Sequence, residues 1–331
     1  MRILLDVMGG DRSPKELIKG GVSSAHERNI DLLIAGDPDL IRSSFASHGE
    51  REGSRFSILP STQVVQMADP PVRAVRDKKQ SSLVLGLEAL RAGDADAFVS
   101  PANTGAVVAG SIFQLGRIHG IPRPGIAVPF PTLPGRELIL IDVGANSDCV
   151  ADHLLHFAKM GLAYARKVLG IAKPSVGLLN IGAEEGKGNR LIRNAFDMLR
   201  QSDLPFVGNV EAHHLLTDRP ADVVVCDGFV GNVFLKAVEG GVNAVTSLLR
   251  RSIRERLTAK LGALFMRGAF RKLRETLSYR SRGGAPLLGV DGAVVIAHGR
   301  SDAEAISSAI DVACREVETG LLAHLAEDAR G

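Results

Sequence analysis

The chain has 331 residues, of which 45% are hydrophobic and 23% are charged, and its formal net charge is +3. This composition excludes intrinsic disorder and a collagen-like structure, and the length is enough for two domains or one large α/β domain. There is no Trp and there are only two Tyr. A base-stacking surface needs exposed rings, so we expect no nucleic-acid partner.

Short β-like runs alternate with longer helical patterns along the chain. We predict strands at 3–7, 32–35, 56–59, 97–100, 138–142, 176–180, 206–207, 223–226 and 294–297. Helices are predicted at 14–28, from 38 onward, and at 81–91, 104–116, 152–169 and 302–322. This alternation predicts a mostly parallel sheet that is covered by helices on both faces. The Pro/Gly stretch 120–135 and the basic segment 250–282 are the clearest candidate boundaries.

The cysteines and the N-terminus indicate the compartment. Cys149, Cys226 and Cys314 are far apart, and such a sparse, odd set is typical of a reducing compartment. The N-terminus enters a strand-like run at once, which is not the pattern of a signal peptide. No stretch approaches the roughly 18 apolar residues of a membrane-spanning helix. We therefore expect a cytoplasmic protein.

The segment 250–282 is strongly basic, with eleven Lys or Arg against two Glu, a local charge of +9. Apolar residues recur at helical spacing on both sides of an uncharged centre, 261–266. They are Leu249, Ile253, Leu257 and Leu261, then Met266, Phe270, Leu273 and Leu277. This pattern predicts two amphipathic helices that form a hairpin over 245–282.

An amphipathic hairpin with cations around an apolar tip suits an anionic membrane surface, with Leu261, Leu264, Phe265 and Met266 as the inserting residues. Two other interpretations stay open. The basic residues can form a solvated helix face, or the helices can pack against a second subunit.

Five predicted strands end in turns of Gly, Asn and Asp. The turns are 6–11, 100–105, 142–146, 180–189 and 227–232. In open α/β sheets, ligands bind beyond the carboxyl ends of the strands, and helix N-termini there offer N–H groups to anions. Gly lets the backbone approach a ligand closely. Five such turns together predict a binding site for an anionic substrate.

Several common site motifs are excluded. The run 182–189 has three residues between its first two glycines and Gly188 after Lys187, so it lacks the spacing and the hydroxyl of a P-loop. Neither a dinucleotide-binding fingerprint nor a serine-hydrolase elbow occurs. His153 and His156 are interpreted as packing or surface residues. We expect no metal and no cofactor.

Eight motifs together resemble the bacterial phosphate acyltransferase family, the acyl-carrier-protein:phosphate acyltransferases of phospholipid synthesis, over nearly the whole chain. The motifs lie at 6–11, 103–105, 142–146, 178–182, 185–189, 208–211, 227–232 and 283–289. Two positions depart from the family pattern: Pro101-Ala102 replaces a small residue and Gly, and Arg282 replaces an aromatic residue.

The resemblance implies a single α/β acyltransferase domain, 1–331, with the hairpin 245–282 protruding from it. The implied fold is a three-layer α/β/α sandwich like those of phosphotransacetylases and isocitrate dehydrogenases. Inorganic phosphate would attack the thioester of an acyl-carrier protein, and the acyl phosphate would pass to a membrane glycerol-3-phosphate acyltransferase. The resemblance also implies a homodimer.

Such chemistry needs a cation, neutral donors and backbone N–H groups that orient phosphate and stabilise an oxyanion. The predicted catalytic residues are Lys187, Asn232, Asn103 and Asp227. The predicted substrate-binding residues are Asp6, Gly9, Gly10, Asp11, Thr104, Gly105, Gly144, Asn146, Asn189, Gly231 and His298. We interpret Cys226 as a buried thiol, and His298 is one candidate for protonating the departing thiolate.

The sequence leaves three alternatives to compare with this function. A small-acyl phosphotransacetylase that uses coenzyme A would need neither the apolar tip nor an acyl groove. A dehydrogenase of the isocitrate type is disfavoured because no paired-Asp metal motif is found. A non-enzymatic membrane-docking protein would leave the five polar turns without a role.

Overall fold

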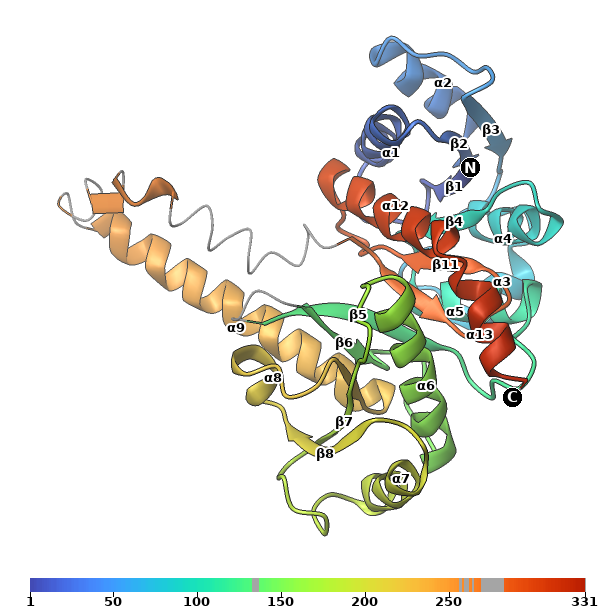
Figure 1. Ribbon diagram of the computed structural model, residues 1–331. Helices are drawn as coiled ribbons and strands as arrows, with labels where there is room; N and C mark the ends of the chain where they lie inside the picture. The colour runs from blue at the N-terminus through green and yellow to red at the C-terminus, as the bar shows by residue number, and fades with distance from the viewer. Residues whose placement is uncertain (133–136, 256–257, 259–261, 264, 269–282, 331) are drawn as a thin grey trace.

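A computed structural model describes residues 1–132, 137–255, 258, 262–263, 265–268 and 283–330. Its centre is a sheet of eleven strands in the order β3-β2-β1-β4-β11-β10-β5-β6-β9-β7-β8 (Figure 1). One half contains β1 (Arg2–Asp6), β2 (Asp31–Gly36), β3 (Phe56–Pro60), β4 (Ala97–Ser100) and β11 (Ala293–Ile296). The other contains β6 (Glu137–Ile141), β7 (Val176–Asn180), β8 (Phe206–Glu211) and β9 (Val223–Val225).

Two further strands, β5 (Gly125–Pro131) and β10 (Ala285–Leu288), join the halves. Every pair that contains β5 or β10 is antiparallel, and the other pairs are parallel. The predicted mostly parallel sheet is therefore confirmed. The candidate boundary at 120–135 includes β5, one of the two strands that join the halves, and it stays a prediction. Its prolines and glycines resemble a loop, but Ile126, Ala127, Val128 and Phe130 are buried in the middle of the sheet.

Helices cover both faces of the sheet. One face carries α3 (Pro71–Asp77), α4 (Ser82–Ala92), α5 (Thr104–Gln114), α8 (His214–Thr217) and α9 (Gly228–Glu255). The other face carries α1 (Pro14–Arg28), α2 (Pro38–Ser47), α6 (Ala151–Lys167), α7 (Arg190–Gln201), α12 (Ala303–Glu318) and α13 (Leu321–Asp328). Along β1, Leu4 packs on the first face, and Ile3 and Leu5 on the second. This period of two confirms the three-layer sandwich.

Short polar side chains cap the first turns of helices, and glycines end helices. Ser81 accepts a hydrogen bond from the Val84 N–H at 3.3 Å, and Asp302 Oδ1 accepts one from the Ala305 N–H at 3.1 Å. The predicted helix 302–322 is wrong in one respect. Gly320 takes a left-handed conformation with φ of 63°, which ends α12 and begins α13.

Helix α9 leaves the body of the molecule as a long arm (Figure 1). It has 28 residues and spans roughly 42 Å at 1.5 Å per residue. The sequence predicts that the hairpin starts at 245. The structure shows that its first arm is the C-terminal part of α9, which begins at Gly228, in the turn after β9. Leu261, Leu264 and 269–282 lie outside the described residues, so the hairpin itself stays a prediction. No described helix is both long and apolar enough to cross a membrane.

Candidate functional site

The first strand-end turn is organised by a buried carboxylate. Asp6 at the end of β1 is fully buried and accepts hydrogen bonds from Ser82 Oγ at 2.7 Å and Ser100 Oγ at 2.8 Å. It also accepts one from the Met8 N–H at 3.0 Å. Burial raises the pKa of Asp6, and these hydrogen bonds oppose that effect. From its buried position, Asp6 therefore links the turn after β1 to the end of β4 and to the start of α4.

The turns after β1, β4 and β11 pack directly against one another. A side chain at Gly9 would place its Cβ 2.4 Å from Ala102 Cβ, so only glycine fits there. The Asp11 N–H donates to the Gly299 carbonyl at 2.7 Å. These contacts bring the predicted residues Gly9, Gly10 and Asp11 beside the turn that carries His298. We call this group the first cluster.

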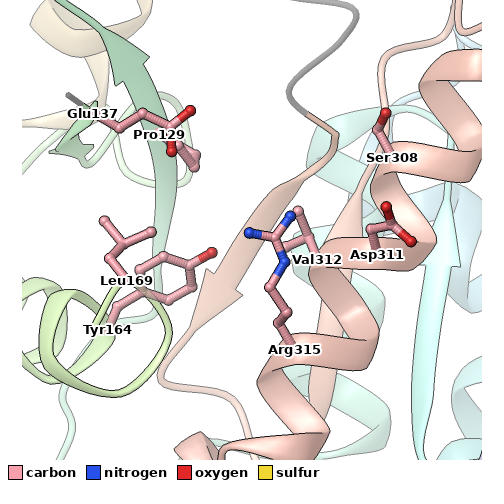
Figure 2. A pocket seen from close by; sticks show the side chains of 8 residues that line it. All are labelled: Pro129, Glu137, Tyr164, Leu169, Ser308, Asp311, Val312 and Arg315. Carbon is pink, nitrogen blue, oxygen red and sulfur yellow. The ribbon is translucent and has the colours of Figure 1, made fainter. Parts of the chain in front are cut away.

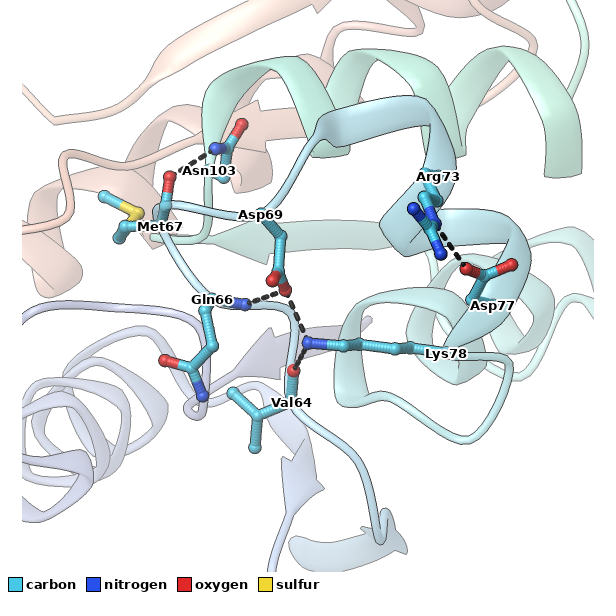
Figure 3. A network of polar contacts seen from close by, with 8 residues as sticks. All are labelled: Val64, Gln66, Met67, Asp69, Arg73, Asp77, Lys78 and Asn103. Atoms are coloured by element: carbon cyan, nitrogen blue, oxygen red, sulfur yellow. Dashed lines mark hydrogen bonds and ion pairs between the residues drawn. The ribbon is translucent and has the colours of Figure 1, made fainter.

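Asn103 joins the first cluster to a loop that the sequence did not reveal. Its Oδ1 accepts from the Ala106 N–H at 3.1 Å and caps α5, while its Nδ2 donates to the Met67 carbonyl at 2.7 Å (Figure 3). Lys78 holds the same loop through the Val64 carbonyl and Asp69. Both ends of the Asn103 amide are therefore engaged. The predicted residues Thr104 and Gly105 form the first turn of α5.

A second cluster lies at the ends of β6 and β9. Asp142 is fully buried, and its carboxylate accepts from the backbone N–H groups of Ile126, Gly144, Ala145 and Asn146 at 2.8–3.0 Å. The Asn146 side chain donates to Asp142 at 2.9 Å and to the Pro124 carbonyl at 2.7 Å. Asp142 therefore organises the turn after β6 in the same way that Asp6 organises the turn after β1. The sequence placed Asp142 in a turn motif without assigning it this role.

The N-terminus of α9 completes the second cluster. Asp227 Oδ1 accepts from the Val230 N–H at 2.9 Å, and the Gly228 N–H donates to the Asn146 carbonyl at 2.8 Å. A Cβ on Gly231 would lie 2.0 Å from the Asp142 carbonyl oxygen, so the helix can approach only because Gly231 has no side chain. This close approach puts Asn232 next to Gly144, with its Nδ2 3.7 Å from the Cβ position there.

Helix α9 carries a cation from the second cluster toward the first. Lys236 follows Asn232 by one helical turn on the same face, and its Nζ lies 3.5 Å from Glu239 Oε2. Desolvation lowers the pKa of His298, and the positive charge of Lys236 lowers it further. Glu239, Arg300 and Asp11 also act on this imidazole. Sequence reasoning missed Lys236, although its spacing from Asn232 was a usable signal.

Lys187 lies at a third strand end, in the loop after β7. The loop backbone is held by side chains: Asn180 Nδ2 donates to the Lys187 carbonyl at 3.2 Å, and Asn209 Nδ2 donates to the Glu184 carbonyl at 2.9 Å. Asn189 Oδ1 accepts from the Ile192 N–H at 3.0 Å and caps α7. The Lys187 side chain is exposed and has no polar partner within the described ranges. Among the described residues, no hydrogen bond or ion pair joins this loop to the first cluster.

The cysteines near the second cluster are protonated at neutral pH. Cys226 is buried and donates to the Asp142 carbonyl, with an Sγ–O distance of 3.3 Å, which confirms the predicted buried thiol. Burial and then the negative charge of Asp142 raise its pKa well above the usual range. The same two causes raise the pKa of Cys149 to about 12. Neither thiol is therefore suited to act as a nucleophile.

A cavity of about 130 Å³ lies elsewhere, between α6 and α12 against β5 (Figure 2). It is lined by Pro129, Glu137, Tyr164, Leu169, Ser308, Asp311, Val312 and Arg315. None of the predicted site residues lines it, so the strand-end turns and this cavity are separate features. Within the described part of the chain, no group of three or more His, Cys, Asp or Glu is arranged to hold a metal ion.

Comparisons with known proteins agree with this architecture. Residues 1–324 match the model of a family described as "Fatty acid synthesis protein". A phosphate acyltransferase of Heliobacterium modesticaldum is 46% identical over 331 residues, covering 100% of this chain and 98% of that protein.

Two solved structures share the fold. A phosphotransacetylase from Streptococcus pyogenes superposes with a TM-score of 0.65 at 15% identity, covering 96% of this chain and 94% of that one. A 4-hydroxythreonine-4-phosphate dehydrogenase from Klebsiella pneumoniae superposes with a TM-score of 0.55 at 11% identity, covering 98% and 99%. The predicted phosphotransacetylase-like fold is confirmed. The chain therefore belongs to the fatty acid synthesis protein family, in which its close relatives are phosphate acyltransferases, and it is an acyltransferase.

Proposed function

We propose that the protein transfers a long-chain acyl group from an acyl-carrier protein to inorganic phosphate, which yields acyl phosphate for phospholipid synthesis. The observation that carries the proposal is that polar strand-end turns gather at the N-terminus of α5 and at that of α9, where Asn103 and Asp227 cap the two helices. Asn232 lies beside Gly144 at the N-terminus of α9, and Lys236 follows it by one helical turn. Helix N-termini and a cation attract a phosphate dianion.

In the proposed reaction, a phosphate oxygen attacks the carbonyl carbon of the thioester. The new C–O bond forms, a tetrahedral oxyanion develops, and the C–S bond then breaks to release the carrier thiolate. Phosphate is already ionised near neutral pH, so the protein mainly orients it and stabilises the oxyanion. No covalent cysteine intermediate is needed, in keeping with the raised pKa values of Cys149 and Cys226.

The structure suggests different roles for the four predicted catalytic residues. Asn232 and Lys187 are exposed and are proposed to contact phosphate or the oxyanion. Asn103 and Asp227 cap α5 and α9, and we propose that they act by aiming those N-termini at the anion. His298 is proposed to bind substrate in its neutral form, because its lowered pKa disfavours the imidazolium.

The donor can be tested against the runner-up, a small-acyl phosphotransacetylase that uses coenzyme A, which the Streptococcus pyogenes fold match keeps open. We expect phosphate-dependent release of thiol from long-chain acyl-carrier protein, with acyl phosphate trapped by hydroxylamine. Long-chain and short-chain acyl-coenzyme A are measured in parallel. Thiol release from short-chain acyl-coenzyme A alone would overturn the proposed donor and favour the runner-up.

We further propose that the protein is a homodimer and associates peripherally with anionic membranes. Support for the dimer is the exposed apolar set on α9, with Phe229 63% and Val245 66% exposed. Support for the membrane is the end of the same helix, where Arg250, Arg251 and Arg254 precede the tip. Delivery at the membrane would limit the exposure of a labile acyl phosphate to water and bring it to a membrane glycerol-3-phosphate acyltransferase.

The membrane proposal predicts that replacing Phe265 and Met266 with Asp abolishes sedimentation with anionic vesicles and leaves soluble turnover intact. These side chains are 88% and 53% exposed, so replacing them does not disturb the hydrophobic core. The substitutions remove only the apolar groups that would insert into the membrane. High salt should weaken the binding of the parent protein without eliminating it, because salt screens only the charge contribution of roughly 1 kcal/mol per basic residue. Val207→Asp, at another exposed apolar position, is the control. Equal sedimentation of parent and double variant would refute the tip as a membrane anchor.

A further inference from the structure

A second surface combines cations with exposed apolar side chains, far along the chain from the tip at 261–266. It is formed by α3, the residues that follow it, and the end of α5. Its members are Val72, Arg73, Arg76, Lys79 and Phe113, and we call it the α3 face. Val72 is 47% exposed and Phe113 is 46% exposed. Arginine and aromatic residues at an exposed surface are typical of protein-recognition sites.

The α3 face is net positive because Arg73, Arg76, Lys78 and Lys79 outnumber the two nearby carboxylates, Asp69 and Asp77. Asp77 Oδ2 is bound by Arg73 Nε at 3.1 Å, and Asp69 is bound by Lys78 (Figure 3). Arg76 has no carboxylate partner in the part of the chain that the structure describes. Its guanidinium carbon stands 5.3 Å from the centre of the Phe113 ring. This cation–π contact holds the guanidinium at the surface and leaves its N–H groups available to an acidic partner.

The α3 face begins at the edge of the first cluster. Pro71, the first residue of α3, lies so close to the turn after β4 that a Cβ on Gly105 would be 2.8 Å from Pro71 Cγ. The loop just before α3 is bound by Asn103 through the Met67 carbonyl. Phe113 lies about 13 Å along the α5 axis from Thr104, at 1.5 Å per residue. A protein docked on this face would therefore sit next to the turns proposed to bind phosphate.

We infer that the α3 face docks the acidic surface of the acyl-carrier protein, so that the thioester at the end of its flexible arm reaches the first cluster. The inference rests on the acyl donor proposed above. Complementary charge would orient the carrier, and Val72 and Phe113 would supply the apolar contact that charge alone does not provide. The α3 face would then serve a protein partner, and the tip at 261–266 would serve a membrane.

The test is a charge reversal with a matched control. Arg76→Glu is expected to raise the KM for long-chain acyl-carrier protein by about tenfold or more and to leave kcat at saturation near that of the parent. Turnover of acyl-coenzyme A, which makes no protein–protein contact, should be unchanged. Arg166→Glu reverses an exposed charge on α6, on the opposite face of the sheet, and should behave like the parent. Phe113→Ser should also raise the KM for the carrier, by loss of the apolar contact.

Binding of holo-carrier protein and of anionic vesicles is measured with the same variants. Arg76→Glu should lose carrier binding and keep vesicle binding. Parent-like carrier KM and affinity in both Arg76→Glu and Phe113→Ser would overturn the assignment of the face. Loss of vesicle binding in Arg76→Glu with intact carrier kinetics would overturn it in favour of a membrane contact. If the parent itself neither binds nor deacylates the carrier, the proposed donor fails, and the docking inference fails with it.

Discussion

Lys187→Ala is expected to lower phosphate-dependent turnover by a factor on the order of 10²–10³, as for the loss of one oxyanion-stabilising donor. The loop that carries Lys187 is held by backbone contacts, among them the hydrogen bond from Asn180 to the Lys187 carbonyl. The substitution keeps that carbonyl, so the loop should retain its shape. The exposed ammonium group is the part that is lost, and with it a charge that is free to meet an anion.

Steady-state kinetics against phosphate and against the acyl donor will check this result. Lys173→Ala is the matched control, because Lys173 is an exposed lysine that precedes β7, at the opposite end of the same strand. It should leave both kinetic constants unchanged. If Lys187→Ala folds normally and keeps the kcat and the phosphate KM of the parent, Lys187 has no part in the reaction.

Glu316→Gln is expected to stabilise the protein at alkaline pH and to change its stability little near pH 5. Glu316 on α12 is 6% exposed, and its Oε1 has no hydrogen-bond partner among the described residues. Burial raises the pKa of this carboxyl from 4.5 to about 8. An unpartnered carboxylate is costly in the interior, so the folded protein keeps Glu316 protonated.

The direction of the pH effect follows from proton binding. Between the unfolded pKa near 4.5 and the folded pKa near 8, the folded state holds a proton that the unfolded state has lost. The free energy of unfolding therefore falls as pH rises through this window, by about 3–5 kcal/mol in total at roughly 1.4 kcal/mol per pKa unit. Glutamine does not titrate and escapes this loss.

Thermal unfolding of parent and variant at about pH 5 and about pH 8.5 will measure the effect. The stability difference should be small at the lower pH and should amount to several degrees in Tm at the higher one. Glu318→Gln removes a carboxylate that is 52% exposed in the same helix, and it should show no such pH dependence. A Glu316→Gln difference that is equal at both pH values would show that the buried carboxyl titrates normally.

Local pattern in the sequence was enough to predict most of the strands and to propose the strand-end turns as the candidate site. Strands such as 3–7 and 176–180 are runs of buried apolar residues, and each ends in a polar, Gly-rich turn. Because parallel strands put these turns at one edge of a sheet, the sequence alone predicts that Asn103, Asn146 and Asn232 belong to the site. The family motifs indicated acyl transfer to phosphate, because they are short, contiguous and specific.

Only the tertiary structure decided what each polar side chain does. Asp6 and Asp142 are part of the motifs, but burial and donors from distant segments make them the centres of the two turns. Asp6 accepts from the hydroxyls of Ser82 and Ser100, and Asp142 accepts from the Ile126 N–H. The strands β5 and β10 escaped prediction because their prolines and glycines resemble loops, and long-range pairing overrides that local signal. The contact of Arg76 with the Phe113 ring is likewise a product of packing between separate elements, as is the burial of Glu316, whose Oε1 has no hydrogen-bond partner among the described residues. The periodicity of the sequence determines which side of a helix or strand is apolar. Which other element packs against that side depends on how the whole chain folds.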